Sequence, residues 1–171
     1  MKTKFLFLCF SATILMACEN NDPIIVSKQT TTMDNVQYTY YVTDIAATEK
    51  STFSKNEQLI VHLDVQNMGN DTIWANSQFH GGMCYDTKGN GIEELSAYVY
   101  EDSVPVIQSI SPNKVLHYAY AFKLDVSSGV YYYKNPSIQL FSASVDVEKD
   151  SDPAEFTKNV MIPLSINFKV Q

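Results

Sequence analysis

The sequence contains no arginine. All twelve basic residues are lysines, set against nineteen acidic residues, for a net charge of −7. Arginine supplies the planar group that grips phosphates and carboxylates with two parallel hydrogen bonds. A chain that lacks this group and carries excess negative charge repels phosphate backbones. We therefore expect no nucleic-acid partner.

The sequence also lacks an apolar run long enough to span a bilayer. Its most apolar N-terminal stretch is the short run 5–10, which follows Lys2 and Lys4 and continues into residues 11–15. A charged segment followed by a short apolar run is typical of a secretory signal peptide. We predict that residues 1–17 form such a signal.

The expected signal ends at Leu15-Met16-Ala17-Cys18, where a small residue directly precedes a cysteine. This segment resembles the lipobox of bacterial lipoproteins. The resemblance implies cleavage after Ala17, a diacylglycerol thioether on Cys18 and acylation of the new amino terminus. The membrane is then the partner of this lipid. Ten lysines against nineteen acidic residues would remain in the mature chain, a net charge of −9.

Cysteine is scarce, with three residues in the chain. Cys9 lies in the expected signal and Cys18 is the expected lipid site, so Cys84 alone remains. No intrachain disulfide can form, and the fold must depend on its apolar core. Because Met83 and Tyr85 flank Cys84, we predict a buried side chain in preference to a reactive thiol.

Residues 18–35 are mostly polar, with Ile24 to Val26 as the apolar exception. This composition predicts a flexible tether between the lipid and the folded domain. Acidic residues soon after the cysteine resemble the surface-export signal of Bacteroidetes lipoproteins. The resemblance implies an outer-membrane location and favours exposure on the outer face.

Helical periodicity is absent from residues 36–171. Runs of Val, Ile, Tyr, Phe and Thr are broken by Gly, Asn, Asp and Pro, which is typical of β-strands and turns. Apolar residues alternate with polar ones in 59–66, 115–124 and 160–170. This pattern predicts one all-β domain, an antiparallel β-sandwich, with a closed barrel as the alternative. Two prolines in 102–112 predict an edge strand or a loop there, and Pro163 predicts an edge position at the start of the last strand.

Two resemblances refine this fold. The segment 127–133 resembles the corner that begins strand F in immunoglobulin-like sandwiches, which implies that the Tyr131 hydroxyl bonds back to the backbone. The turn motifs at 65–73, 85–89 and 110–114 are similar, in kind and order, to those of immunoglobulin-like domains in bacterial envelope lipoproteins. The intracellular proteinase inhibitor (BsuPI) family has the same order. Together they imply an immunoglobulin-like β-sandwich.

Tyrosine is abundant, with eleven residues. Neighbours on a strand face opposite sides of a sheet, so some of these rings must lie on the surface. Exposed tyrosine offers rigid, amphipathic contact area to a protein or glycan. We take Tyr98, Tyr100 and Tyr132 as a candidate binding surface. The alternative is that these rings simply cover an outer sheet face.

Residues for metal binding or catalysis are sparse. His80, Cys84 and Asp86 give only part of a transition-metal site, and His62 or His117 would have to complete it from other strands. The chain has no Gly-x-Ser-x-Gly elbow, Cys/His signature or phosphate loop. We therefore expect no metal, no cofactor and no enzymatic activity.

Two tripeptides resemble the O-glycosylation sequon of Bacteroidetes-type exported proteins. They are Asp71-Thr72-Ile73 and Asp102-Ser103-Val104. The resemblance implies that Thr72 and Ser103 are candidate modification sites.

The first functional hypothesis is a non-catalytic, lipid-anchored envelope protein that acts as a binding or interaction module for a protein or glycan. One alternative is a proteinase inhibitor resembling BsuPI, with residues 102–112 or 148–156 as the inhibitory loop. The other is a structural component of an envelope assembly.

Overall fold

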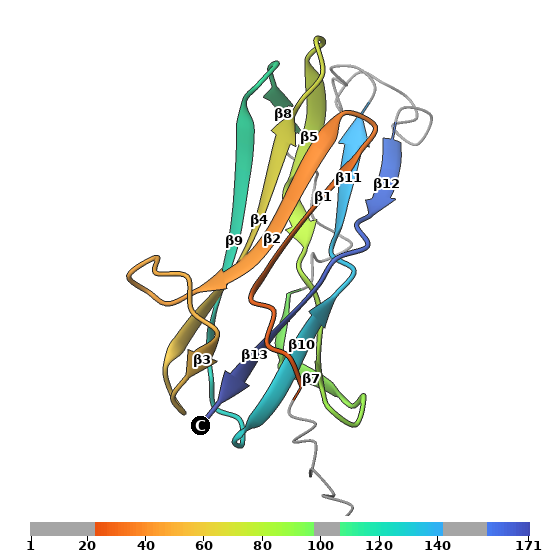
Figure 1. Ribbon diagram of the computed structural model, residues 1–171. Helices are drawn as coiled ribbons and strands as arrows, with labels where there is room; N and C mark the ends of the chain where they lie inside the picture. Colours follow the sequence, from red (N-terminus) through yellow and green to blue (C-terminus); the bar gives the residue numbers. More distant parts are fainter. Residues whose placement is uncertain (1–22, 98–106, 142–156) are drawn as a thin grey trace, which may run out of the picture.

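The computed structural model describes residues 23–97, 107–141 and 157–171 of the chain (Figure 1). These residues form strands joined by turns, with no helix among them. The strands are β1 (Lys28–Met33), β2 (Val36–Thr43), β3 (Thr52–Phe53), β4 (Gln58–Asn67), β5 (Ile73–His80), β6 (Gly82–Asp86), β7 (Gly91–Ala97), β8 (Ile107–Ile110), β9 (Val115–Lys123), β10 (Gly129–Lys134), β11 (Ser137–Phe141), β12 (Thr157–Met161) and β13 (Ser165–Val170). Across the described ranges, no helix has the length and apolarity needed to cross a membrane.

The strands are arranged in two layers. The front sheet has the order β1-β2-β4-β9. The orders β3-β13-β10-β6-β7 and β12-β11-β5-β8 describe two further ladders. The chain passes directly from one of these ladders into the other at three places, namely β5 to β6, β10 to β11 and β12 to β13. Both ladders therefore belong to one bent sheet (Figure 1). Inner side chains of the front sheet reach this bent sheet, as in the 6.2 Å contact between the Phe122 and Tyr133 rings.

The strand order is that of an immunoglobulin-like sandwich. In the front sheet β4 lies between β2 and β9, and in the bent sheet β10/β11 lies between β5/β6 and β12/β13. These positions correspond to A-B-E and C-F-G in the immunoglobulin arrangement. The predicted antiparallel β-sandwich is confirmed, with β3 as a short parallel addition beside β13.

The core consists of the residues that the alternation predicted. Leu59, Val61, Leu63 and Val65 of β4 are all 0% exposed. The residues assigned to the inner face of 160–170 are also buried, namely Val160, Ile162, Leu164, Ile166, Phe168 and Val170. Period two therefore placed these side chains on the correct face of each strand.

The bent sheet is interrupted along one line by residues that cannot continue a regular strand. Gly82 has φ of 86°, and a Cβ at this position would lie 2.7 Å from the Lys134 carbonyl oxygen. On the next strand, Asn135 has φ of 50° and precedes Pro136. On the third strand, Pro163 separates β12 from β13. The three interruptions divide the long strands at the same level and bend the sheet there.

The N-terminal boundary of the domain differs from the expected one. Residues 18–35 were expected to be tether, but Lys28–Met33 forms β1 and pairs with β2. Two hydrogen bonds tie the segment just before β1 to Asn167 of β13. The Asn167 side-chain Nδ2 donates to the Ile24 carbonyl oxygen, and the Asn167 backbone N–H donates to the Val26 carbonyl oxygen. The polar composition hid this strand because β1 is an edge strand with one exposed face, so it needs few apolar residues.

The proline-containing stretches lie at edges of the sheet. β8, within the proline-containing stretch 102–112, lies at the edge of its ladder as predicted. The single strand expected at 160–170 is two strands, of which β12 is at an edge. β13 has neighbours on both sides, and the edge position expected at the start of this stretch is that of β12. Pro163 lies in the break itself, where no ladder hydrogen bond is required of it.

Candidate functional site

The outer face of the bent sheet carries a pair of tyrosines. Tyr85 of β6 and Tyr132 of β10 lie directly opposite each other on neighbouring antiparallel strands. The side chains next to Tyr132 in sequence, Tyr131 and Tyr133, are 5% and 0% exposed and point into the core. Alternation therefore places Tyr132, and with it Tyr85, on the outer face, where both are half-buried.

Lys134 covers this pair. Its Nζ lies 5.6 Å from the centroid of the Tyr85 ring and 5.5 Å from that of Tyr132. An ammonium group at such distances is attracted by the negative faces of both rings. We name Tyr85, Tyr132 and Lys134 the tyrosine face. Two aromatic rings and one cation can supply apolar contact and a charged hydrogen-bond donor to one ligand.

The strand beneath the tyrosine face is held rigidly. The Tyr131 ring stacks on Phe168 with centroids 5.7 Å apart, and its hydroxyl donates to the Ser127 carbonyl oxygen at 2.7 Å. This is the backbone bond that a tyrosine corner requires. The Tyr133 hydroxyl donates to the Leu95 carbonyl oxygen at 2.7 Å. With both neighbours anchored, Tyr132 has a defined position on the outer face.

The tyrosines expected to form the binding surface have different outcomes. Tyr132 lies on an outer face, while Tyr98 and Tyr100 lie outside the described residues. Tyr85 was not among the tyrosines expected on this surface, because its partner across the sheet depends on strand register. Within the described ranges, the tyrosines are either buried or half-buried, and most of the buried ones line the core.

The expected modification sites are only partly described. Thr72 is exposed in the turn between β4 and β5, and its hydroxyl is accessible there. Ser103 and the expected lipid site Cys18 lie outside the described residues. Glycosylation and lipidation stay predictions.

The partial metal site at His80, Cys84 and Asp86 is not assembled. Cys84 is a free, buried thiol, as predicted, and burial raises its pKa to about 12. Asp86 accepts hydrogen bonds from the backbone amides of Lys88 and Asn90, both at 2.8 Å, and so closes its own turn. In the described part of the chain, no group of three or more His, Cys, Asp or Glu side chains is placed to hold a metal ion.

The front sheet carries a chain of hydrogen bonds on its own outer face. Thr43 Oγ1 lies 2.7 Å from His62 Nε2, His62 Nδ1 lies 3.2 Å from His117 Nε2, and His117 Nδ1 contacts the Asp64 carboxylate. Burial lowers the pKa of His62, and the neighbouring His117 adds to this effect while Asp64 opposes it. Sequence alternation placed both histidines on outer faces, but their contact depends on the register of β4 and β9.

This chain of hydrogen bonds is not a nucleophile with its base. The Thr43 hydroxyl also lies 2.9 Å from the Asp44 carbonyl oxygen, which competes with His62 for its proton. Thr43 is also only 4% exposed, which keeps a substrate from its oxygen. No catalytic function is identified in the described residues.

The comparisons with known proteins do not assign the chain to a family. It matches no protein-family model and no curated protein. The C-terminal domain of wzt is similar with a TM-score of 0.46 and 12% identity, over 84% of this chain and 78% of that one. The yjhA protein from Bacillus subtilis has a TM-score of 0.34 and 14% identity, over 84% and 96%.

A family 123 glycoside hydrolase from Clostridium perfringens is also similar. Its TM-score is 0.37 with 13% identity, and the match covers 80% of this chain but only 27% of that one. At these values the likenesses carry no argument about family, binding or activity. The lipoprotein and BsuPI resemblances stay predictions.

Proposed function

We propose that this protein is a non-catalytic binding module, lipid-anchored in a bacterial envelope, which contacts a protein or glycan partner through the tyrosine face. The observation that carries the proposal is the pairing of Tyr85 with Tyr132 under one lysine, on an outer sheet face. Half-buried tyrosine rings give contact area at a low cost in side-chain entropy, which is why tyrosine is enriched in interfaces.

The composition of the tyrosine face suits a neutral or acidic partner. Lys134 supplies a positive charge on a chain whose net charge is −7. It can donate hydrogen bonds to hydroxyls, carbonyls or carboxylates, while the rings contact C–H surfaces. Protein and glycan partners both present these groups, so the experiment has to distinguish them.

The test compares the full chain with a Tyr85→Ala, Tyr132→Ala double variant in two assays. One is capture of envelope proteins identified by mass spectrometry, and the other is binding to immobilised glycans. We expect one partner class to be lost, with affinity reduced by at least about tenfold. Tyr41→Ala is the matched control, because Tyr41 is a half-buried tyrosine on the outer face of the other sheet. Equal binding by all three proteins would rule out the tyrosine face.

The lipid anchor is tested separately at Cys18. We expect Cys18→Ala to leave the signal uncleaved and to abolish labelling by a palmitate analogue, because the thioether must form before cleavage in the lipoprotein class that the sequence resembles. Membrane fractionation and intact-mass measurement give the readouts. A Cys84→Ala variant should be processed like the unmodified chain. Unchanged processing of Cys18→Ala would contradict the anchor while leaving the tyrosine face untouched.

The anchor would also set how far the domain reaches from the membrane. Because Ile24 is already bonded to Asn167, only residues 18–23 can act as tether. An extended chain spans at most about 3.3–3.6 Å per residue, so this tether reaches roughly 20 Å. The domain would therefore stay close to the bilayer surface.

A further inference from the structure

Two histidines meet on the outer face of the front sheet, on the side of the sandwich opposite the tyrosine face. His62 of β4 lies opposite Ala119 of β9, and Asp64 lies opposite His117, which makes the two histidines diagonal neighbours. Their ring centroids are 5.1 Å apart at an interplanar angle of 36°. The 3.2 Å contact between His62 Nδ1 and His117 Nε2 therefore joins the rings edge to edge.

The other nitrogen of each ring is already engaged. His62 Nε2 lies 2.7 Å from Thr43 Oγ1, a hydroxyl oxygen that can accept a hydrogen bond from the ring or donate one to it. The Asp64 carboxylate can only accept, so a proton of His117 is on Nδ1. In the neutral His117 ring the lone pair is then on Nε2, which faces His62 Nδ1. A separation of 3.2 Å suits a hydrogen bond in which His62 Nδ1 donates to His117 Nε2, and it equally suits two nitrogen ligands of one metal ion.

We propose that His62 and His117 form a binding site for a divalent transition-metal ion of the zinc, copper and nickel class. Two nitrogens bound to zinc at about 2.0–2.1 Å in tetrahedral geometry lie about 3.3 Å apart, close to the separation seen here. Imidazole nitrogen suits these ions, whereas magnesium and calcium prefer oxygen. The ion takes the place of the hydrogen atom between the two rings, the proton of neutral His62 is then on Nε2 toward the Thr43 oxygen, and water completes the coordination.

The surroundings support the two ligands. Thr43 and Asp64 hold the outer nitrogens, as second partners of metal-binding histidines commonly do. The Tyr41 ring stacks on the His62 ring with centroids 4.6 Å apart. Lys28 Nζ lies 5.3 Å from the centroid of the Tyr41 ring, and β2, which carries Tyr41, lies between the strands of Lys28 and His62. Lys28 is also paired with Glu49 at 3.1 Å, so its charge is partly balanced before it reaches the site.

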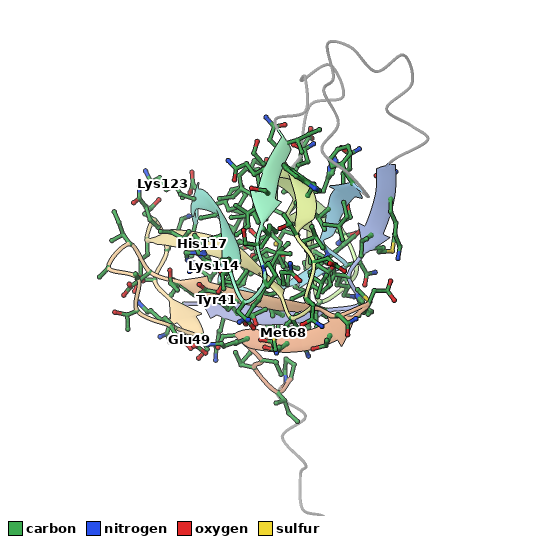
Figure 2. The ribbon with its side chains drawn as sticks, turned by 90° about the horizontal axis from the view of Figure 1, so that it is seen from above. Tyr41, Glu49, Met68, Lys114, His117 and Lys123 are labelled. Atoms are coloured by element: carbon green, nitrogen blue, oxygen red, sulfur yellow. The ribbon has the colours of Figure 1, made fainter. Side chains whose placement is uncertain are left out.

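Access comes from the His117 side. The His117 side chain is 50% exposed, whereas His62 as a residue is 7% exposed. Figure 2 shows His117 and Tyr41 on the same side of the molecule. With two protein ligands, the site would exchange its ion with solvent and would not be a permanent structural centre.

The first experiment observes the histidine rings of the full chain directly. The chain has three histidines, so their side-chain ¹H–¹⁵N signals are readily separated. On addition of zinc chloride at neutral pH, we expect the ring nitrogens of His62 and His117 to shift together and to saturate at one ion per chain. His80, which lies on β5, serves as the internal reference. A shift of His80 alone, or no shift of the pair at millimolar zinc, overturns the proposal.

The second experiment measures zinc affinity by calorimetry in three variants. His117→Ala removes one ligand and should weaken binding by more than tenfold. Asp64→Asn keeps both ligands and should weaken binding by roughly 10–100-fold, as loss of a second partner does. His80→Ala is the matched control and should bind like the unmodified chain. Equal affinity in His117→Ala and the unmodified chain would show a structural histidine pair only. Should His117→Ala fail to fold, the histidine spectra of the unmodified chain still decide.

Discussion

Tyr131 and Cys84 are two buried side chains whose surroundings fix their positions in the interior. The Tyr131 ring packs on Phe168 and its hydroxyl bonds to Ser127 in the turn before β10. Cys84 lies beneath the tyrosine face, on the inner side of β6, and is 0% exposed. Sequence neighbours indicated its burial correctly, since Met83 and Tyr85 flank it. The contacts that bury it come from other strands.

The first prediction concerns the reactivity of Cys84. Because burial raises its pKa to about 12, the thiolate fraction in the folded protein at pH 8 is on the order of one in ten thousand. We expect iodoacetamide to leave the Cys84 peptide unlabelled in the native protein and to label it fully in guanidinium chloride, as measured by peptide mass spectrometry. Rapid labelling of the native protein would show that the thiol is accessible.

At the scale of elements, the bend in the long sheet decides where strands begin and end. It separates β5 from β6, β10 from β11 and β12 from β13, so that the single strand expected at 160–170 is two strands. The Tyr40 hydroxyl, from the front sheet, donates to the Gly81 carbonyl oxygen at this bend. A carbonyl freed from the ladder thus obtains a partner across the sandwich.

The second prediction concerns Gly82 at the bend. Gly82→Ala should reduce the free energy of unfolding by about 2–4 kcal/mol, because it adds both a left-handed backbone penalty and a clash with the Lys134 carbonyl. Gly89→Ala is the control, since Gly89 has φ of 85° but nothing within 4 Å of the added Cβ. It should cost about 1–2 kcal/mol. If urea unfolding showed the same loss of free energy of unfolding in both variants, the added Cβ at Gly82 would not clash with the Lys134 carbonyl.

At the scale of the whole molecule, the sandwich depends on buried tyrosines in place of a disulfide. Tyr38, Tyr40, Tyr118 and Tyr133 are all at most 5% exposed and lie between the two sheets. Two of their hydroxyls bond across the sandwich, that of Tyr40 to the Gly81 carbonyl oxygen and that of Tyr118 to the Asn76 carbonyl oxygen at 2.5 Å. The N-terminal segment adds a further tie, because β1 pairs with β2 while Ile24 bonds to Asn167 in the other sheet.

The third prediction follows from the pKa values of these tyrosines. Burial raises the pKa of Tyr38 to about 12 and that of Tyr40 and Tyr133 well above 10. Between pH 10 and their raised pKa values, these tyrosines stay protonated in the folded state but ionise in the unfolded chain. Their contribution to the free energy of unfolding is therefore fully present below pH 10 and is lost as pH rises toward the pKa values of the folded state. We expect the free energy of unfolding to fall above pH 10, by up to about 1.4 kcal/mol per pH unit for each such tyrosine.

Urea unfolding measured from pH 7 to pH 12 checks this expectation. Absorbance at the wavelength of tyrosinate follows ionisation in the same samples. Ionisation of all tyrosines near pH 10 without unfolding would contradict the burial on which the prediction rests. Tyr132→Phe is a suitable control, since this residue lies on the outer face and its removal should leave the alkaline transition in place.

The sequence by itself determined which side of each strand faces the core, because alternation is a local property of an extended chain. Leu59 to Val65 and Val160 to Val170 were assigned correctly on this basis. It also determined the all-β class and the position of the Tyr131 corner. Only the tertiary structure decided the register, which brings Tyr85 beside Tyr132 and His62 beside His117. Register depends on pairings between distant segments, and no periodicity along one segment contains that information.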